Sequence, residues 1–160
     1  MNSVGKRVIS IVFINLLFMT LLFAELKVGE NFPSLTLVNP YNQTVTVSKK
    51  GELTLLLSFE KDISTGIQIF LEEQERDFLI EHHMLYVSDI SSLPKFLVNF
   101  FVLPKLKVFE FQVALLYDEN KLNREEKKIT IIHLKDNVIM DIDFIEINAL
   151  ESFMAKSASS

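Results

Sequence analysis

The chain has 160 residues, nearly half of them apolar, with 14 phenylalanines and neither cysteine nor tryptophan. This length and apolar content are enough for one domain with one packed core, and they argue against disorder. The absence of cysteine excludes a disulfide, a thiolate nucleophile and an iron–sulfur or zinc–thiolate site. The formal net charge of −5 at pH 7 disfavours binding to nucleic acid or to anionic lipid surfaces.

Residues 1–24 have the pattern of a secretory signal peptide. Lys6 and Arg7 precede an apolar run from Val8 to Phe23, and Ala24 supplies a small residue before the sequence becomes polar. The segment predicts export, to the periplasm in a Gram-negative bacterium and otherwise to another extracytoplasmic site. An uncleaved membrane anchor stays open as the alternative, because Leu22 fits a small-x-small cleavage site poorly. Removing these residues, which carry two basic and no acidic side chains, changes the net charge from −5 to −7.

Hydrophobic periodicity divides residues 25–156 into strands and helices and leaves 157–160 as a disordered tail. In the first half we expect a hairpin of strands at 35–37 and 44–47, a buried strand at 53–59, a helix capped by Ser64 and reaching Leu79, and a strand at 84–88. In the second half we expect a helix from Ser92 to Pro104, a strand at 113–117, strands at 129–134 and 138–145 joined by a tight turn, and a final helix with a capping box of Asn148 and Glu151.

This order predicts one α/β domain of three layers. Strands and helices alternate in its middle, and antiparallel hairpins stand at both ends, so the central sheet is mixed. The strand at 53–59 is an almost continuous apolar run, which is typical of a central strand covered on both faces.

Three strings in this order resemble the thioredoxin-like superfamily of peroxiredoxins and thiol reductases. The entry segment from Val28 to Leu37 has a glycine and then a proline before an apolar pair, Gly51 precedes the central strand, and Lys128 to Asn137 is a strand followed by a tight turn. The resemblance covers about Leu26 to Lys156. It implies a thioredoxin-like three-layer domain with an N-terminal β-hairpin and a C-terminal β-hairpin plus helix.

The resemblance also implies where the family's chemistry would lie. Its nucleophilic cysteine follows the central strand, where the N-terminus of a helix stabilises a thiolate, and its cis-proline faces that thiol. Here these positions hold Asp62, Ile63, Ser64, Thr65, Gly66 and Lys128. We interpret them as a vestigial active site, and we expect no catalytic residue, cofactor or metal there.

The hydroxyl, imidazole and charged side chains suggest little other chemistry. Ser64 and Thr65 could be nucleophiles, but the sequence offers no base nearby, so helix capping is the favoured interpretation. His82 and His83 are adjacent and point in different directions, so we expect solvated rings, while His133 should be a half-buried strand residue. Lys61 and Asp62, which end the central strand, are either a recognition patch or a solvated strand end.

Five aromatic residues crowd the stretch from Phe96 to Phe111. We expect most of them to pack in the core; the alternative is an exposed apolar patch that binds a partner. The sequence therefore favours an exported, redox-inactive domain that contacts an unidentified protein in the cell envelope, with no nucleic acid and no membrane contact beyond residues 1–24. The alternative is a component of an oxidoreductase pathway that uses a bound cofactor or a partner's thiols. Enzymatic activity stays undecided, with non-enzymatic function favoured.

Overall fold

The computed structural model describes residues 25–47, 49–118 and 122–157, so the expected signal segment and residues 158–160 of the expected tail lie outside the described part. The strands are β1 (Leu37–Val38), β2 (Thr44–Val45), β3 (Glu52–Ser58), β4 (Met84–Asp89), β5 (Val113–Leu116), β6 (Ile129–Lys135) and β7 (Val138–Ile145). The helices are α2 (Lys61–Glu72), α3 (Phe78–Glu81), α4 (Lys95–Leu97), the π-helix η1 (Val98–Val102), α5 (Leu103–Leu106), the 3₁₀-helix η2 (Ile147–Ala149) and α6 (Leu150–Ser157). Within these ranges, no helix combines the length and the apolar character needed to cross a membrane.

The strands form one seven-stranded mixed sheet in the order β2-β1-β5-β4-β3-β6-β7. Strand β3 lies near its middle, parallel to β4 and antiparallel to β6. Its two faces are covered by separate cores, which is why an apolar run without alternation is stable there. The mixed sheet and the two terminal hairpins confirm the fold class expected from the sequence.

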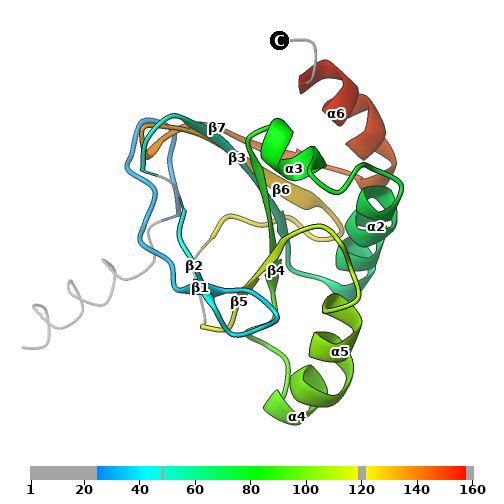
Figure 1. The fold of residues 1–160 in the computed structure, drawn as a ribbon. Helices are drawn as coiled ribbons and strands as arrows, with labels where there is room; N and C mark the ends of the chain where they lie inside the picture. The colour runs from blue at the N-terminus through cyan, green and yellow to red at the C-terminus, as the bar shows by residue number, and fades with distance from the viewer. Residues whose placement is uncertain (1–24, 48, 119–121, 158–160) are drawn as a thin grey trace, which may run out of the picture.

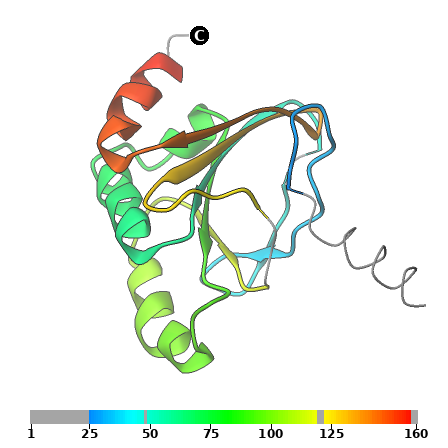
Figure 2. The same cartoon turned by 180° about the vertical axis from the view of Figure 1, so that it is seen from behind.

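The three layers are a row of helices, the sheet, and an irregular N-terminal layer. Figure 1 shows α2, α4, α5 and α6 along one side of the sheet, with the first described residues on the other side. The reverse view in Figure 2 has the same arrangement. Side chains of β3 alternate between two cores: Leu56 packs under the helices, whereas Leu55 and Leu57 pack with Phe32 beneath the N-terminal layer.

The turn between β6 and β7 is the tight turn that the sequence predicts. Asp136 and Asn137 both have positive φ, 50° and 68°, the pattern of a two-residue hairpin whose twist matches its strands. The Asp136 side chain accepts a hydrogen bond from the Gly51 N–H at 2.9 Å, and the Asp136 N–H donates to the Gly51 carbonyl, also at 2.9 Å. The turn therefore fixes the entry to β3.

The capping assignments made from the sequence are wrong at both ends of the domain. Helix α2 begins at Lys61, and Ser64 lies inside it, since its N–H already donates to the Glu60 carbonyl at 2.9 Å. Asn148 lies within η2 rather than in a capping box. The expected single helix from Ser64 to Leu79 is interrupted after Glu72 and resumes as the short α3.

Pro104 does not end the helical segment after β4, as the sequence suggested. The segment starts at Lys95 and widens into η1 over Val98–Val102 before α5 begins at Leu103. Pro104 therefore lies directly after η1, as the second residue of α5, and the helical segment continues through it.

Helix α2 approaches the C-terminal segment closely at Gly66. A Cβ added there would overlap Ile147 Cγ1 and lie 2.6 Å from Ile147 Cδ1. Gly66 therefore serves the packing of α2 against η2, and only the smallest residue leaves this contact undisturbed.

A double-mutant cycle tests that contact. In an Ile147→Ala background, Gly66→Ala should raise the free energy of unfolding by about 1 kcal/mol, the gain in helix propensity. In the wild-type background the overlap with Ile147 should cancel most of that gain. Chemical denaturation of the four proteins measures the coupling. Equal stabilisation in both backgrounds would show that the Ile147 side chain moves aside without an energetic cost.

Candidate functional site

The N-terminus of α2 and the loop before β6 are joined by one carboxylate. Glu60, the residue before α2, accepts a hydrogen bond from the Lys127 N–H through Oε1 at 2.7 Å. Lys127 has a left-handed backbone, with φ of 58°. The start of α2 and the loop before β6, which the resemblance implies should face each other, are therefore in contact. The Glu60 carboxylate that joins them lies at the N-terminus of a 12-residue helix, where the helix dipole favours negative charge.

The six expected site residues, Asp62 to Gly66 and Lys128, do not form one cluster of exposed groups. Asp62 is exposed in the first turn of α2, whereas Ile63 is only 5% exposed and belongs to the core. Ser64, Thr65 and Gly66 are half-buried in the helix. The Lys128 ammonium lies 2.6 Å from the Glu125 carboxylate.

Four hydroxyl groups meet beneath the first turns of α2, at the ends of β3 and β4. Ser58 Oγ lies 2.8 Å from Ser64 Oγ and 3.2 Å from the Tyr86 hydroxyl. Ser64 Oγ is also 3.4 Å from Ser88 Oγ. Among the described residues, Ser64 thus has hydroxyl partners and no carboxylate or imidazole to activate it. The network satisfies buried polar groups and holds α2 on the sheet.

The three histidines are separate, and each has a structural setting. His133 is half-buried, with Nδ1 3.0 Å from Thr54 Oγ1, as expected for a strand residue. His82 is not freely solvated as expected, because its Nδ1 lies 2.8 Å from the Phe78 carbonyl oxygen; His83 is exposed. The described part of the chain has no group of three or more His, Asp or Glu side chains that could hold a metal ion.

A cavity of about 320 Å³ lies between α2, the end of β4 and the segment from η1 to α5. This volume is at the lower end of the range of small-molecule pockets. Its buried lining includes Ser88, Ile90 and Leu106, and its exposed rim includes Lys61 and Lys105. Glu60, Ser64 and Thr65 are also part of the lining, so the cavity adjoins both the junction of Glu60 with Lys127 and the expected site residues on α2.

Gln68 lines this cavity with an unused acceptor. The side chain is 6% exposed, and its Oε1 is buried without a hydrogen-bond partner. A buried amide oxygen that has lost water and gained no donor destabilises the fold. Gln68 is therefore a buried polar group that opposes the stability of the fold.

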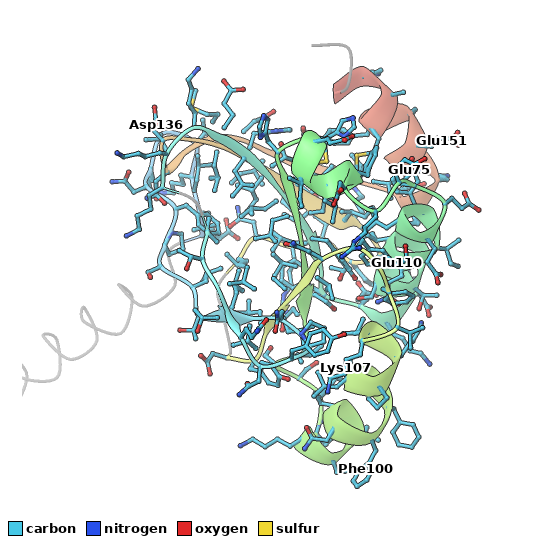
Figure 3. The ribbon with its side chains drawn as sticks, viewed as in Figure 1. Glu75, Phe100, Lys107, Glu110, Asp136 and Glu151 are labelled. Carbon is cyan, nitrogen blue, oxygen red and sulfur yellow. The ribbon has the colours of Figure 1, made fainter. Side chains whose placement is uncertain are left out.

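The aromatic stretch after β4 is largely exposed, contrary to the expectation of core packing. Phe96, Phe100 and Phe101 are 60%, 74% and 68% exposed, and with the exposed Leu93 they form what we call the aromatic surface. Figure 3 shows Phe100 at the end of the molecule, pointing away from the sheet. Phe109 is half-buried and Phe111 is buried.

The inward face of this segment explains why the phenylalanines point outward. Val98, Val102 and Leu106 pack against the core and repeat every four residues. This spacing places the three side chains on one face of the helical segment, which passes through η1 into α5. The remaining positions, including Phe100 and Phe101, are left facing solvent.

Sequence reasoning missed Gln68, which carries a recognisable signal. Ile63, Ile67 and Leu71 form the buried stripe of α2, and Gln68 lies beside Ile67 on that stripe. A polar residue on a buried helix face needs a hydrogen-bond partner. The signal was therefore present in the periodicity, but the cavity itself depends on distant segments.

Replacing Gln68 tests whether its amide is unsatisfied. Gln68→Met keeps the length of the side chain and removes the buried acceptor, so we expect the free energy of unfolding to rise by about 1–3 kcal/mol. Gln112→Met, at an exposed position, should change it by less than about 0.5 kcal/mol. Denaturant titration measures both. Destabilisation by Gln68→Met would mean that the amide already has a partner.

No protein-family model matches the sequence, and no curated protein matches it. The chain does match solved structures. A peroxiredoxin-like protein from Aquifex aeolicus has a TM-score of 0.51 at 14% identity, with 85% of this chain and 88% of that chain covered.

Two further structures have the same fold. A candidate protein disulfide isomerase from Bacteroides thetaiotaomicron has a TM-score of 0.54 at 14% identity, covering 82% of this chain and 87% of its own. The reduced 2-Cys peroxiredoxin of Plasmodium vivax has a TM-score of 0.53 at 11% identity, covering 82% and 80%. Identities this low show the fold alone. The chain has the thioredoxin-like fold of the peroxiredoxins, and it has no cysteine.

Proposed function

We propose that this chain is a redox-inactive, exported thioredoxin-like domain that acts by contact with a protein partner in the cell envelope. The absence of cysteine leaves it no thiol of its own for the chemistry associated with the fold. The signal-like segment at residues 1–24 supports export. The observation that carries the proposal is the aromatic surface.

The aromatic surface has the composition of a binding site. Single exposed apolar residues are common on proteins, as at Ile69 and Ile80. Here three phenylalanines gather on a single helical segment, and aromatic residues are enriched where protein interfaces form. Burying these rings against a partner would remove their apolar area from water, which stabilises a complex.

Protein is a better occupant of this surface than a lipid bilayer. The chain without residues 1–24 has a net charge of −7 from its sequence, and this charge repels an anionic membrane.

Affinity capture with matched variants tests the proposal. The bait proteins are the wild type, the double variant Phe96→Ser/Phe100→Ser, and the control Ile69→Ser/Ile80→Ser, which removes exposed apolar residues elsewhere. After cross-linking in intact cells, mass spectrometry should identify the same partner with the wild type and the control. Its recovery with the phenylalanine variant should fall by about tenfold or more, as expected when interface anchors are lost.

Four results would contradict the proposal. The first is equal recovery with all three baits. The second is binding to anionic vesicles that depends on Phe96 and Phe100. The third is turnover of insulin disulfides or peroxide by the pure chain. The fourth is flavin or haem absorbance of the purified chain, which would favour a cofactor-dependent oxidoreductase.

A further inference from the structure

The outer edge of β7 is uncovered over most of its length. The strand is the last of the sheet and pairs with β6 on its inner side. The N-terminal segment reaches only its beginning, where the Gly29 N–H donates to the Ile139 carbonyl at 2.7 Å and the Ile139 N–H donates to the Glu30 carbonyl at 2.9 Å (Figure 2). In the described part of the chain, no other segment forms a backbone hydrogen bond with this edge from Met140 to Ile145.

A β-bulge decides which backbone groups of β7 face outward. The pairing with β6 shifts by one residue at Met140, so the outward positions change from Ile139 before the bulge to Ile142 and Phe144 after it. The Ile142 N–H agrees with this assignment, because it donates to the Asp141 carboxylate at 2.9 Å. A strand added at this edge would supply a carbonyl for the Ile142 N–H and would release the carboxylate.

The side chains of β7 divide into an acidic face and an apolar face. Asp143 pairs with Ile131, which belongs to the core under the helices, and Asp141 lies on the same face because side chains alternate along a strand. Ile142 packs against the core beneath the N-terminal layer, and Phe144 shares that face. A segment that pairs with this edge is therefore expected to alternate as well, with one face beside carboxylates and the other beside apolar side chains.

The charge of this edge discriminates between possible occupants. From Asp136 to Ala155 the chain has acidic residues and no basic residue, and neither Asp141 nor Asp143 forms a salt bridge with a described residue. Two copies paired through this edge about a two-fold axis would place these carboxylates next to their counterparts, and like charges opposite each other destabilise a strand pair. A segment with lysine or arginine at alternate positions is attracted instead.

We infer that the uncovered edge of β7 binds an extended segment of another protein, in which basic and apolar residues alternate, as an added β-strand. A carbonyl of that segment replaces Asp141 at the Ile142 N–H, and the carboxylate pairs with a basic side chain. In this mode of recognition, main-chain hydrogen bonds supply affinity and alternate side chains supply specificity. The inference goes beyond the proposed function, since β7 shares no residue with the aromatic surface, and the two lie at opposite ends of the molecule in Figure 1.

A short peptide tests the inference. The probe is a fluorescein-labelled, amidated hexapeptide, Lys-Val-Lys-Val-Lys-Val, added to the full chain, and fluorescence anisotropy measures its binding. We expect saturable binding that weakens as salt is raised, and no detectable binding of the same peptide with glutamate in place of lysine. Only alternate N–H groups of an added strand face β7. Of two versions N-methylated at the lysines or at the valines, one should therefore lose affinity by about tenfold or more, and the other should keep it.

Variants of the chain locate the binding at β7. Asp141→Asn/Asp143→Asn should weaken binding by about tenfold, because the charges are lost, while asparagine still offers an oxygen to the Ile142 N–H. The matched control is Glu110→Gln/Asp118→Asn, which removes the same charge at exposed positions flanking β5. Strands β4, β3 and β6 separate β5 from β7, so the control should keep the wild-type affinity.

Five results would overturn the inference. They are the absence of saturable binding, equal binding of the glutamate peptide, wild-type affinity of both N-methylated versions, an equal loss in the two double variants, and dimerisation of the pure chain that the peptide displaces, which would identify a second copy as the occupant. None of them involves Phe96 or Phe100, so the proposed function stands or fails on its own experiment.

Discussion

The enclosure of β3 is the constraint on which the rest of the structure depends. The strand is paired on both edges and covered on both faces. Only the residues at its two ends are left to contact other segments of the chain. At the carboxyl end, Phe59 and Glu60 are all that separates the strand from α2. Glu60 accepts the Lys127 N–H, and the hydroxyls of Ser58 and Ser64 meet beneath the helix. Hydrogen bonds thus hold together the start of α2, where the sequence led us to expect a vestigial active site.

The cavity beside α2 adjoins this same end of the helix, since Glu60 and Ser64 are part of its lining. There Gln68 keeps an acceptor that no described group uses, and the widened helix η1 keeps its phenylalanines in solvent. Both features oppose stability, one through desolvation and the other through exposed apolar area. Proteins retain such features where function requires them.

The sequence predicted the layers better than the site, and the difference has physical causes. The buried strands and the turn at Asp136 and Asn137 follow from local periodicity and turn chemistry, which depend only on residues close together in the sequence. The start of α2 was misplaced because Ser64 is a good cap in isolation, and its tertiary hydroxyl partners are not visible in the sequence. The outward phenylalanines were missed because the segment is apolar on several faces, so periodicity alone did not decide which face packs on the sheet. The cavity required four segments to be placed in space.

The π-helix also suggests how the aromatic surface could arise in evolution. A π-turn contains about one more residue than an α-turn, and each residue advances a helix by roughly 100°. A helix one residue shorter between Val98 and Val102 would therefore turn the following side chains to another side. The orientation of these side chains then depends on the length of the helical segment as well as on residue type. Insertion and deletion, more than substitution, would be the route by which relatives with this fold gain or lose such a surface.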